Sequence, residues 1–192
     1  MRSLPIPIST VKKVIKMALI IFIIGTIVLI YFSWWASLKD KRYHGIFRFF
    51  AFESILAIII FNLHNWFIDP FSIKQIISWL LLIASIALVA HGFYLLHKIG
   101  KPKTKENAET TTTLVIQGAY KYIRHPLYAS LILFAIGAFL KYPTWTGIIL
   151  VLITVLSLFL TAKVEEKEVI CKFGKDYEMY MEKTKMFIPF LF

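Results

Sequence analysis

The chain has 192 residues, 58% of them hydrophobic, and its mean hydropathy is +0.71. This content excludes an ordinary water-soluble domain of the same size and indicates an integral membrane protein. The net charge of +11 does not call for a nucleic acid partner, because basic loops of membrane proteins lie beside the cytoplasm and anionic lipid. The single cysteine, Cys171, excludes an internal disulfide and a cysteine metal cluster.

Five apolar segments follow one another along the chain and predict an all-α membrane bundle of about five transmembrane helices. The first three are long enough to cross the hydrocarbon core, which takes about 20 helical residues. The last two are shorter and are joined by a brief polar turn, so they predict a helix-turn-helix hairpin. The predicted spans are residues 15–35, 46–67, 73–96, 127–140 and 145–160 of a single domain, residues 1–192.

Two polar segments, residues 98–126 and 163–192, are expected to form the cytoplasmic, cofactor-binding part of the domain. The stretch from Thr112 to Ile116 is rich in β-branched residues, so part of the first segment is expected to be extended. The second segment carries apolar residues at helical spacing as far as Glu182, which predicts an amphipathic C-terminal helix. The apolar end, Phe187 to Phe192, is expected to dock on the protein.

The distribution of basic residues predicts the orientation. Five spans place the two ends on opposite faces, and most of the 22 lysines and arginines fall in the first and third loops and in the tail. The positive-inside rule therefore places these segments in the cytoplasm and the N-terminus outside. Lys12, Lys13 and Lys16 near the N-terminus argue the other way, with less weight than the total.

The motif Arg124-His125-Pro126 marks the point where the first polar segment meets the fourth span. Proline is favoured in the first turn of a helix, so Arg124 and His125 should lie just outside a helix N-terminus, where an anion binds well. Glu165 and Glu166 follow the hairpin and return to the same face. We expect a pocket here that admits a polar cofactor from the cytosol and a lipophilic substrate from the bilayer.

Each of these residues also has a plainer interpretation. Arg124 is typical of a cytoplasmic anchor, and the glutamates are typical of a solvated first turn of a helix. Glu53 and His64 in the second span are either functional or paired with each other. Histidines in and beside the second and third spans leave haem ligation open. The scattered glycines contain no Gly-x-Gly-x-x-Gly, which excludes a Rossmann nucleotide site.

The segment from Thr112 to Pro189 resembles the isoprenylcysteine carboxyl methyltransferase family. The family pattern is Arg-His-Pro-x-Tyr, an apolar hairpin, Glu-Glu, Phe-Gly, two spaced tyrosines and a late proline. This chain matches it with Arg124, His125, Pro126, Tyr128, Glu165, Glu166, Phe173, Gly174, Tyr177, Tyr180 and Pro189. The resemblance implies an S-adenosylmethionine-dependent membrane methyltransferase whose acceptor is lipophilic, most simply the carboxylate of an isoprenylated cysteine.

The resemblance also implies roles for individual residues. Arg124, Glu165 and Glu166 are the predicted catalytic residues: the arginine would orient a carboxylate, and a glutamate would bind the cofactor or act as a base for an amine or thiol. No metal ligand is predicted. Eukaryotic members carry a substrate-linked arginine where this chain has Thr161. The predicted cofactor contacts are Thr113, Leu114, Val115, Gln117, Gly118, Tyr120, His125, Pro126, Leu127, Tyr128 and Glu165.

Other functions share parts of this pattern. The C-terminal segment is more loosely similar to membrane sterol reductases, which use NADPH, and to small phospholipid N-methyltransferases. The sterol reductases are much longer, so 192 residues favour methyl transfer. A non-enzymatic scaffold or a haem protein is the alternative from a different class. The pattern leaves the oligomeric state open.

Overall fold

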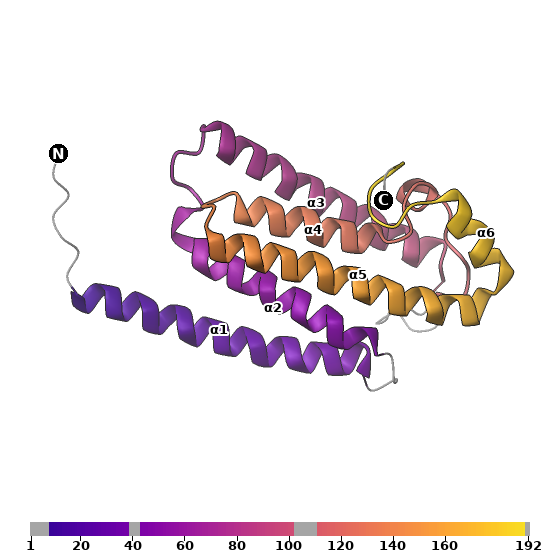
Figure 1. The fold of residues 1–192 in the computed structure, drawn as a ribbon, viewed down its shortest axis with the longest axis horizontal. Helices are drawn as coiled ribbons and strands as arrows, with labels where there is room; N and C mark the ends of the chain where they lie inside the picture. The colour runs from indigo at the N-terminus through magenta and orange to yellow at the C-terminus, as the bar shows by residue number, and fades with distance from the viewer. Residues whose placement is uncertain (1–7, 39–42, 102–110, 191–192) are drawn as a thin grey trace.

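The computed structural model describes residues 8–38, 43–101 and 111–190, and within these ranges it contains helices and no strand, as predicted (Figure 1). Two 3₁₀ helices, η2 (Leu63–Asn65) and η3 (Gly118–Lys121), lie in the connections. Residues 112–116 form bends and irregular loop, so the extended segment expected there is not a strand. The α-helices are α1 (Ile8–Ala36), α2 (His44–Asn62), α3 (Ile73–Lys98), α4 (Pro126–Phe139), α5 (Trp145–Phe173) and α6 (Lys175–Lys183).

Helices α2, α3, α4 and α5 pack as a bundle, in which α2 lies on α5 and α3 lies on α4, while α1 covers α2 at one edge (Figure 1). Small residues allow these helices to approach closely, as is usual between membrane helices. Ala51, Ala135, Ala138 and Ala162 have no exposed surface. Between α3 and α4 the Ser78 hydroxyl donates to a backbone carbonyl of α4 at 2.6 Å.

Within the described ranges, four helices, α1, α2, α3 and α5, are long and apolar enough to cross a membrane. The fourth predicted span, α4, is apolar but has only 14 residues, which reach about 21 Å against a hydrocarbon core of about 30 Å. The predicted five spans are therefore four full-length helices and one short helix. Helix α4 packs against both α3 and α5 and so belongs to the bundle core.

Helix α5 is much longer than the span predicted from its apolar residues. It continues through Lys163 to Phe173, because no glycine or proline interrupts it when its side chains become polar. Gly174, at φ +56°, then ends it in a conformation that favours glycine, and α6 starts at the next residue. The predicted single tail helix is thus divided in two. Glu165 and Glu166 lie inside α5, so their assignment to a first helical turn was wrong.

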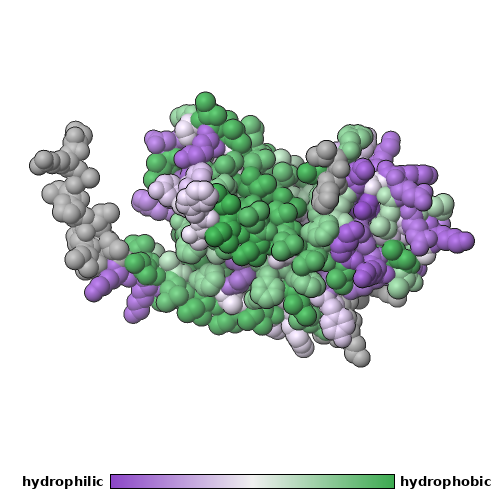
Figure 2. All heavy atoms as spheres, viewed as in Figure 1, coloured by the Kyte–Doolittle hydropathy of each residue, from purple (hydrophilic) through white to green (hydrophobic). Residues whose placement is uncertain are grey.

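The surface of the bundle is apolar along its middle, and hydrophilic side chains gather at the end that carries α6 (Figure 2). The chain end docks in part: Phe187 is buried, whereas Ile188 and Phe190 are exposed. Leu191 and Phe192 lie outside the described residues. Glu53 does not pair with His64; its carboxylate accepts a hydrogen bond from Thr26 Oγ1 at 2.6 Å, which joins α2 to α1.

Candidate functional site

The C-terminal tail fixes the backbone of the Arg-His-Pro motif. The Arg124 N–H donates to the carbonyl of Lys185 at 2.8 Å, and the His125 N–H donates to the carbonyl of Met186 at 3.1 Å. Ile123 and Lys185 form a parallel bridge. Pro126 then begins α4 at its first position, where no N–H is required. The motif is therefore held between the start of α4 and the end of the chain.

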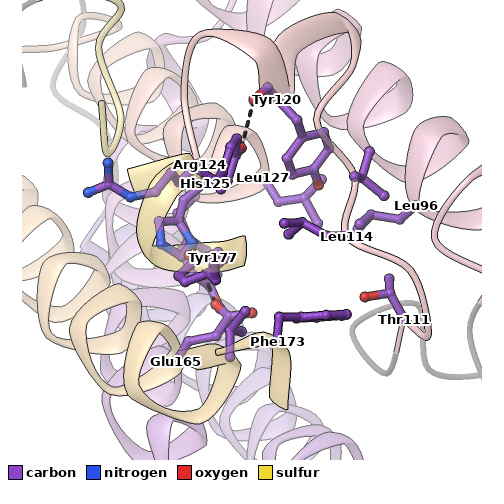
Figure 3. A pocket seen from close by; sticks show the side chains of 14 residues that line it. Leu96, Thr111, Leu114, Tyr120, Arg124, His125, Leu127, Glu165, Phe173 and Tyr177 are labelled. Carbon is purple, nitrogen blue, oxygen red and sulfur yellow. Dashed lines mark hydrogen bonds and ion pairs between the residues drawn. The ribbon is translucent and has the colours of Figure 1, made fainter. Parts of the chain in front are cut away.

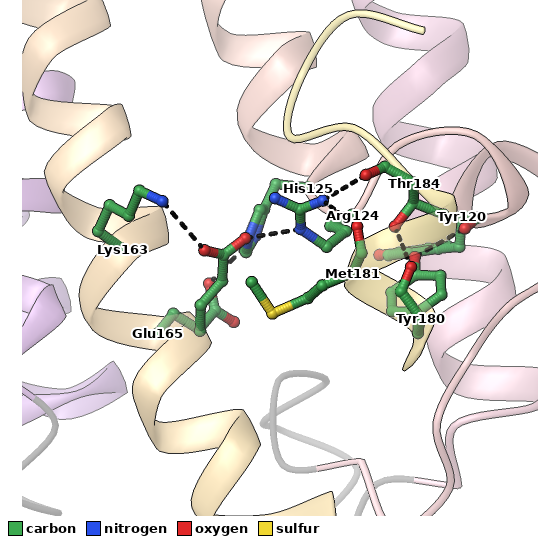
Figure 4. Close-up of polar contacts among 9 residues, drawn as sticks. Tyr120, Arg124, His125, Lys163, Glu165, Tyr180, Met181 and Thr184 are labelled. Atoms are coloured by element: carbon green, nitrogen blue, oxygen red, sulfur yellow. Dashed lines mark hydrogen bonds and ion pairs between the residues drawn. The ribbon is translucent and has the colours of Figure 1, made fainter. Parts of the chain in front are cut away.

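Glu166 is the buried centre of a charged cluster, whose other members Arg124, His125 and Lys163 are labelled in Figure 4. Its side chain is 3% exposed, and its Oε1 accepts a hydrogen bond from Arg124 Nε at 2.7 Å. The same oxygen lies 3.4 Å from His125 Nε2, and its other oxygen lies 3.7 Å from Lys163 Nζ. Buried charges persist only where they are paired and hydrogen-bonded, so the contacts of Glu166 with Arg124 and His125 hold the motif against α5.

The guanidinium of Arg124 points away from the neighbouring cavity (Figure 3). Its Nη1 donates to the backbone carbonyls of Met181, near the end of α6, and of Thr184, which follows α6. Together with Glu166, these acceptors occupy most of its hydrogen-bonding capacity. The structure thus shows that Arg124 positions the motif, a role that the sequence did not reveal. Its predicted contact with a carboxylate of the cofactor or substrate stays a prediction.

A cavity opens between α5, α6 and the loop that precedes α4, with a volume of about 740 Å³ when its mouth is included. A mainly apolar lining with a few polar groups is typical of small-molecule sites. Leu96, Thr111 and Leu114 lie across the cavity from Glu165 and Tyr177 (Figure 3). The lining residues are Leu96, Thr111, Leu114, Val115, Tyr120, Arg124, His125, Leu127, Tyr128, Glu165, Val169, Phe173, Tyr177 and Tyr180.

Glu165 brings an unsatisfied acceptor to this cavity. Its side chain is 16% exposed, and its Oε2 lies 3.6 Å from His125 Nδ1. This oxygen is buried and accepts no hydrogen bond within the described ranges. The His125 ring is itself stacked on Tyr128, with centroids 5.4 Å apart. A buried carboxylate oxygen without a donor costs free energy, so a ligand that donates a hydrogen bond here would be stabilised.

Helix α6 contributes two buried tyrosines, Tyr177 and Tyr180. Burial raises the pKa of both phenols well above the usual value, and the charges of Glu166 and Glu165 raise the pKa of Tyr177 further. Both phenols therefore stay protonated. Tyr180 donates to the carbonyl of Tyr120 at 2.7 Å, which ties α6 to η3.

Most of the predicted cofactor residues line the cavity, namely Leu114, Val115, Tyr120, His125, Leu127, Tyr128 and Glu165. The others do not: Thr113 and Gln117 are exposed, Pro126 is buried in the first turn of α4, and Gly118 packs on α3. Sequence reasoning missed Leu96, Thr111 and Val169, and it recorded Phe173, Tyr177 and Tyr180 only as motif residues. The helical spacing of Phe173, Tyr177 and Tyr180 among charged residues was the feature of the sequence that could have identified them.

Gly118 supports the loop rather than the cavity. It has φ +58°, and a Cβ there would lie 2.4 Å from His91 Nε2. We expect Gly118→Ala to lower the free energy of unfolding by about 1–3 kcal/mol, because backbone strain adds to this clash. Gly174→Ala is the matched control in thermal unfolding: Gly174 has nearly the same φ and nothing within 4 Å of a Cβ. An equal loss in both variants would contradict the role of the His91 contact.

Comparison with known proteins places this site in a family. The family model described as phospholipid methyltransferase matches residues 73–176, which is more than half of the chain. The chain belongs to the phospholipid methyltransferase family. Its match begins with α3 and ends in α6, so it includes Arg124, His125, Glu165 and Glu166. With four helices of membrane-spanning length, membership of this family indicates an integral membrane protein.

Two curated relatives are methanethiol S-methyltransferases. One, from Bradyrhizobium diazoefficiens, is 28% identical over 120 residues, which cover 58% of this chain and 39% of that protein. The other, from Crocosphaera subtropica, is 25% identical over 178 residues, which cover 83% of this chain and 66% of that protein. No solved structure matches the chain. These relatives and the family support methyl transfer, whereas the narrower isoprenylcysteine family is not confirmed.

Proposed function

We propose that this phospholipid methyltransferase family member transfers a methyl group from S-adenosylmethionine to a lipophilic acceptor, with the cofactor in the cavity beside Glu165. One observation carries the proposal. The cavity brings together the motif residue His125, the aromatic rings of α5 and α6, and a carboxylate oxygen of Glu165 that has no donor within the described ranges. These groups come from segments that are far apart in sequence.

The cavity fits the parts of this cofactor. Tyr120, Phe173 and Tyr177 provide apolar faces for a flat purine base. The free oxygen of Glu165 accepts from an ammonium or a ribose hydroxyl. The stacked rings of His125 and Tyr128 suit a positively charged sulfur, because an aromatic face attracts a cation. When bound, the cofactor supplies an electrophilic methyl group on a sulfonium sulfur.

The chain itself supplies binding, orientation and shelter from water. Glu166 and Arg124 hold the motif, and through it the His125 ring, in one position beside Glu165. Helix α6 closes the cavity with Tyr177 and Tyr180, which are both buried. We propose that the acceptor reaches the cavity from the bilayer, because Leu96, Leu114 and Leu127 form an apolar wall opposite Glu165.

The site contains a carboxylate that can accept a proton, which favours an acceptor that loses a proton when it is methylated. Glu165 lines the cavity with its Oε2 3.6 Å from His125 Nδ1, and it is the candidate base. Glu166 is paired with Arg124 and does not line the cavity. Thr161, at the position of the family's substrate-linked arginine, is fully buried, and its hydroxyl donates to the carbonyl of Ser157 at 2.7 Å. A lipophilic amine or thiol therefore fits this site better than the isoprenylcysteine carboxylate that the motif implies.

Cofactor binding tests the proposal before the acceptor is known. We expect the detergent-purified chain to bind S-adenosylhomocysteine at micromolar concentration in a calorimetric titration, and not to bind NADPH. Leu114→Trp, which fills the cavity, should weaken this binding by about tenfold, or about 1.4 kcal/mol. Ile116→Trp is the control, because Ile116 is exposed outside the cavity. Binding of NADPH alone would replace the proposal with a reductase.

Labelled methyl transfer then separates the acceptors. We expect transfer to phosphatidylethanolamine or dodecanethiol to exceed transfer to N-acetyl-S-farnesylcysteine in the same detergent. The rate with the first two should rise with pH until the nucleophile has lost its proton. Transfer to the farnesylcysteine alone would show that the carboxylate is the acceptor after all. Full activity with a small water-soluble acceptor would contradict the route through the bilayer.

A further inference from the structure

A second pocket lies on the other side of Arg124 from the cofactor cavity. Its volume is about 720 Å³ with its open mouth included. Lys163 approaches from α5, and Arg124 approaches from the start of α4 (Figure 4). The lining residues are Arg124, Phe159, Lys163, Met181, Thr184, Lys185 and Met186. We call this pocket, with its three cationic side chains, the basic pocket.

The three cationic side chains of the basic pocket outnumber the single carboxylate in the described structure, that of Glu166, which contacts two of them. No acidic residue of the described ranges lines the pocket; the nearby Glu166 is paired with Arg124 at 2.7 Å and lies 3.7 Å from Lys163. The Lys163 side chain is half exposed, and Lys185 is exposed. Within the part of the chain that the structure describes, Arg124 Nη2 donates to no acceptor. The pocket therefore has donors available for a further anion.

An apolar groove adjoins the basic pocket along α4 and α5. Its volume is about 1070 Å³ including the open mouth, and hydrocarbon side chains form nearly all of its surface. Val155 of the groove and Phe159 of the basic pocket are one helical turn apart on α5, and Lys163 follows after another turn. Phe187 of the groove directly follows Met186 of the pocket. The apolar groove and the basic pocket therefore lie next to each other along one face of α5.

We propose that Arg124, Lys163 and Lys185 bind the phosphate of a membrane phospholipid whose acyl chain lies in the groove. A guanidinium beside two ammonium groups matches a phosphate, and basic pockets between membrane helices are known sites for lipid headgroups. The groove favours a lipid over a soluble anion, because a free phosphate leaves the apolar surface without a partner. This lipid site goes beyond the proposed function, because it does not depend on which molecule accepts the methyl group.

The lipid is a partner of the catalytic site and not its substrate. The contacts of Glu166 with Arg124 and His125 separate the basic pocket from the cofactor cavity. A phosphate bound to Arg124 and Lys163 competes with Glu166 for the same cations. Occupancy of the basic pocket therefore acts on the contacts of Glu166, the residue that holds the His125 ring.

The test compares two double variants of the detergent-purified full chain. Lys163→Gln with Lys185→Gln removes two charges from the basic pocket. Lys167→Gln with Lys175→Gln removes the same charge from exposed positions outside it. Titrations followed by native mass spectrometry use dioleoyl phosphatidylglycerol, dioleoylglycerol and inorganic phosphate as probes. S-adenosylhomocysteine binding is measured in parallel.

We expect the first double variant to bind the phosphatidylglycerol at least tenfold more weakly, and the second to bind it within twofold of the unmodified chain. Dioleoylglycerol, which has the same chains and no phosphate, should bind at least tenfold more weakly to the unmodified chain. Equal binding of the two lipids, or of the phosphatidylglycerol to all variants, would overturn the site. If inorganic phosphate binds as tightly as the phosphatidylglycerol, the pocket is a site for a free anion, and the proposal of a phospholipid site is overturned.

The cofactor measurement keeps this inference separate from the proposed function. The affinity for S-adenosylhomocysteine should stay within twofold in both double variants. If the unmodified chain does not bind this ligand, the proposed function fails, and the lipid result still decides the basic pocket. A tenfold loss of cofactor affinity in the first double variant would show that its lysines act on the cofactor cavity and would overturn a separate lipid site.

Discussion

Glu166→Leu is expected to lower the free energy of unfolding by about 3–5 kcal/mol, as is typical when one partner of a buried ion pair is removed. The substitution leaves the Arg124 guanidinium, 9% exposed in the present structure, without its carboxylate. It also removes the acceptor shared with His125. Unfolding in detergent, followed by the loss of helical circular dichroism, measures the change.

A second substitution, at Arg124, the partner of Glu166, supplies the control for this result. Arg124→Met combined with Glu166→Leu removes the unpaired charge as well, so the double variant should recover most of the stability that Glu166→Leu loses. Glu178→Leu, at an exposed position on α6, should change stability by less than about 1 kcal/mol. If Glu166→Leu behaves like Glu178→Leu, the charged cluster does not hold the motif in place.

Glu165→Gln is expected to reduce kcat/KM for methyl transfer by about 100-fold or more, which corresponds to about 2.7 kcal/mol. The amide preserves the shape of the side chain but removes the charge that faces the cavity. Stability should hardly change, because Glu165 Oε2 accepts no hydrogen bond within the described ranges that the substitution would remove. Initial rates with labelled S-adenosylmethionine measure the effect.

Two further measurements decide what Glu165 does. If the carboxylate binds the cofactor, the dissociation constant of S-adenosylhomocysteine rises in parallel with the loss of kcat/KM. If it is the base, binding stays unchanged, kcat falls, and the rate no longer depends on an acidic group in the pH profile. Glu178→Gln serves as the matched control on the surface. Full activity of Glu165→Gln would move the site away from this cavity.

The helices could be predicted from the apolar runs, because burial in lipid requires continuous hydrophobic segments. Their ends were harder to predict. Helix α2 ends at Asn62, before the predicted Phe67, where the Asn62 amide donates to the carbonyl of Ala138 at 2.9 Å. This bond depends on a distant helix. Helix α5 continues beyond the predicted membrane span, residues 145–160, as expected, because a change from apolar to charged side chains does not interrupt a helix.

The site could be predicted as a meeting of Arg124 and His125 with the glutamates, because the hairpin returns the chain to the same end. The arrangement within the site could not. Arg124 pairs with Glu166, which lies 42 positions later, and also with the carbonyl of Thr184, which lies 60 positions later. Nothing local in the sequence shows that these partners turn the guanidinium away from the cavity or that α6 closes it.

The bonds between the motif and the tail determine when the site forms during synthesis. Arg124 and His125 are translated well before Lys185 and Met186, whose carbonyls fix their backbone. While the later residues are still inside the ribosome, the helices can insert into the membrane, but the motif has not acquired its final partners. The candidate site is therefore completed only after the membrane helices have been made, once Lys185 and Met186 are free to contact the motif.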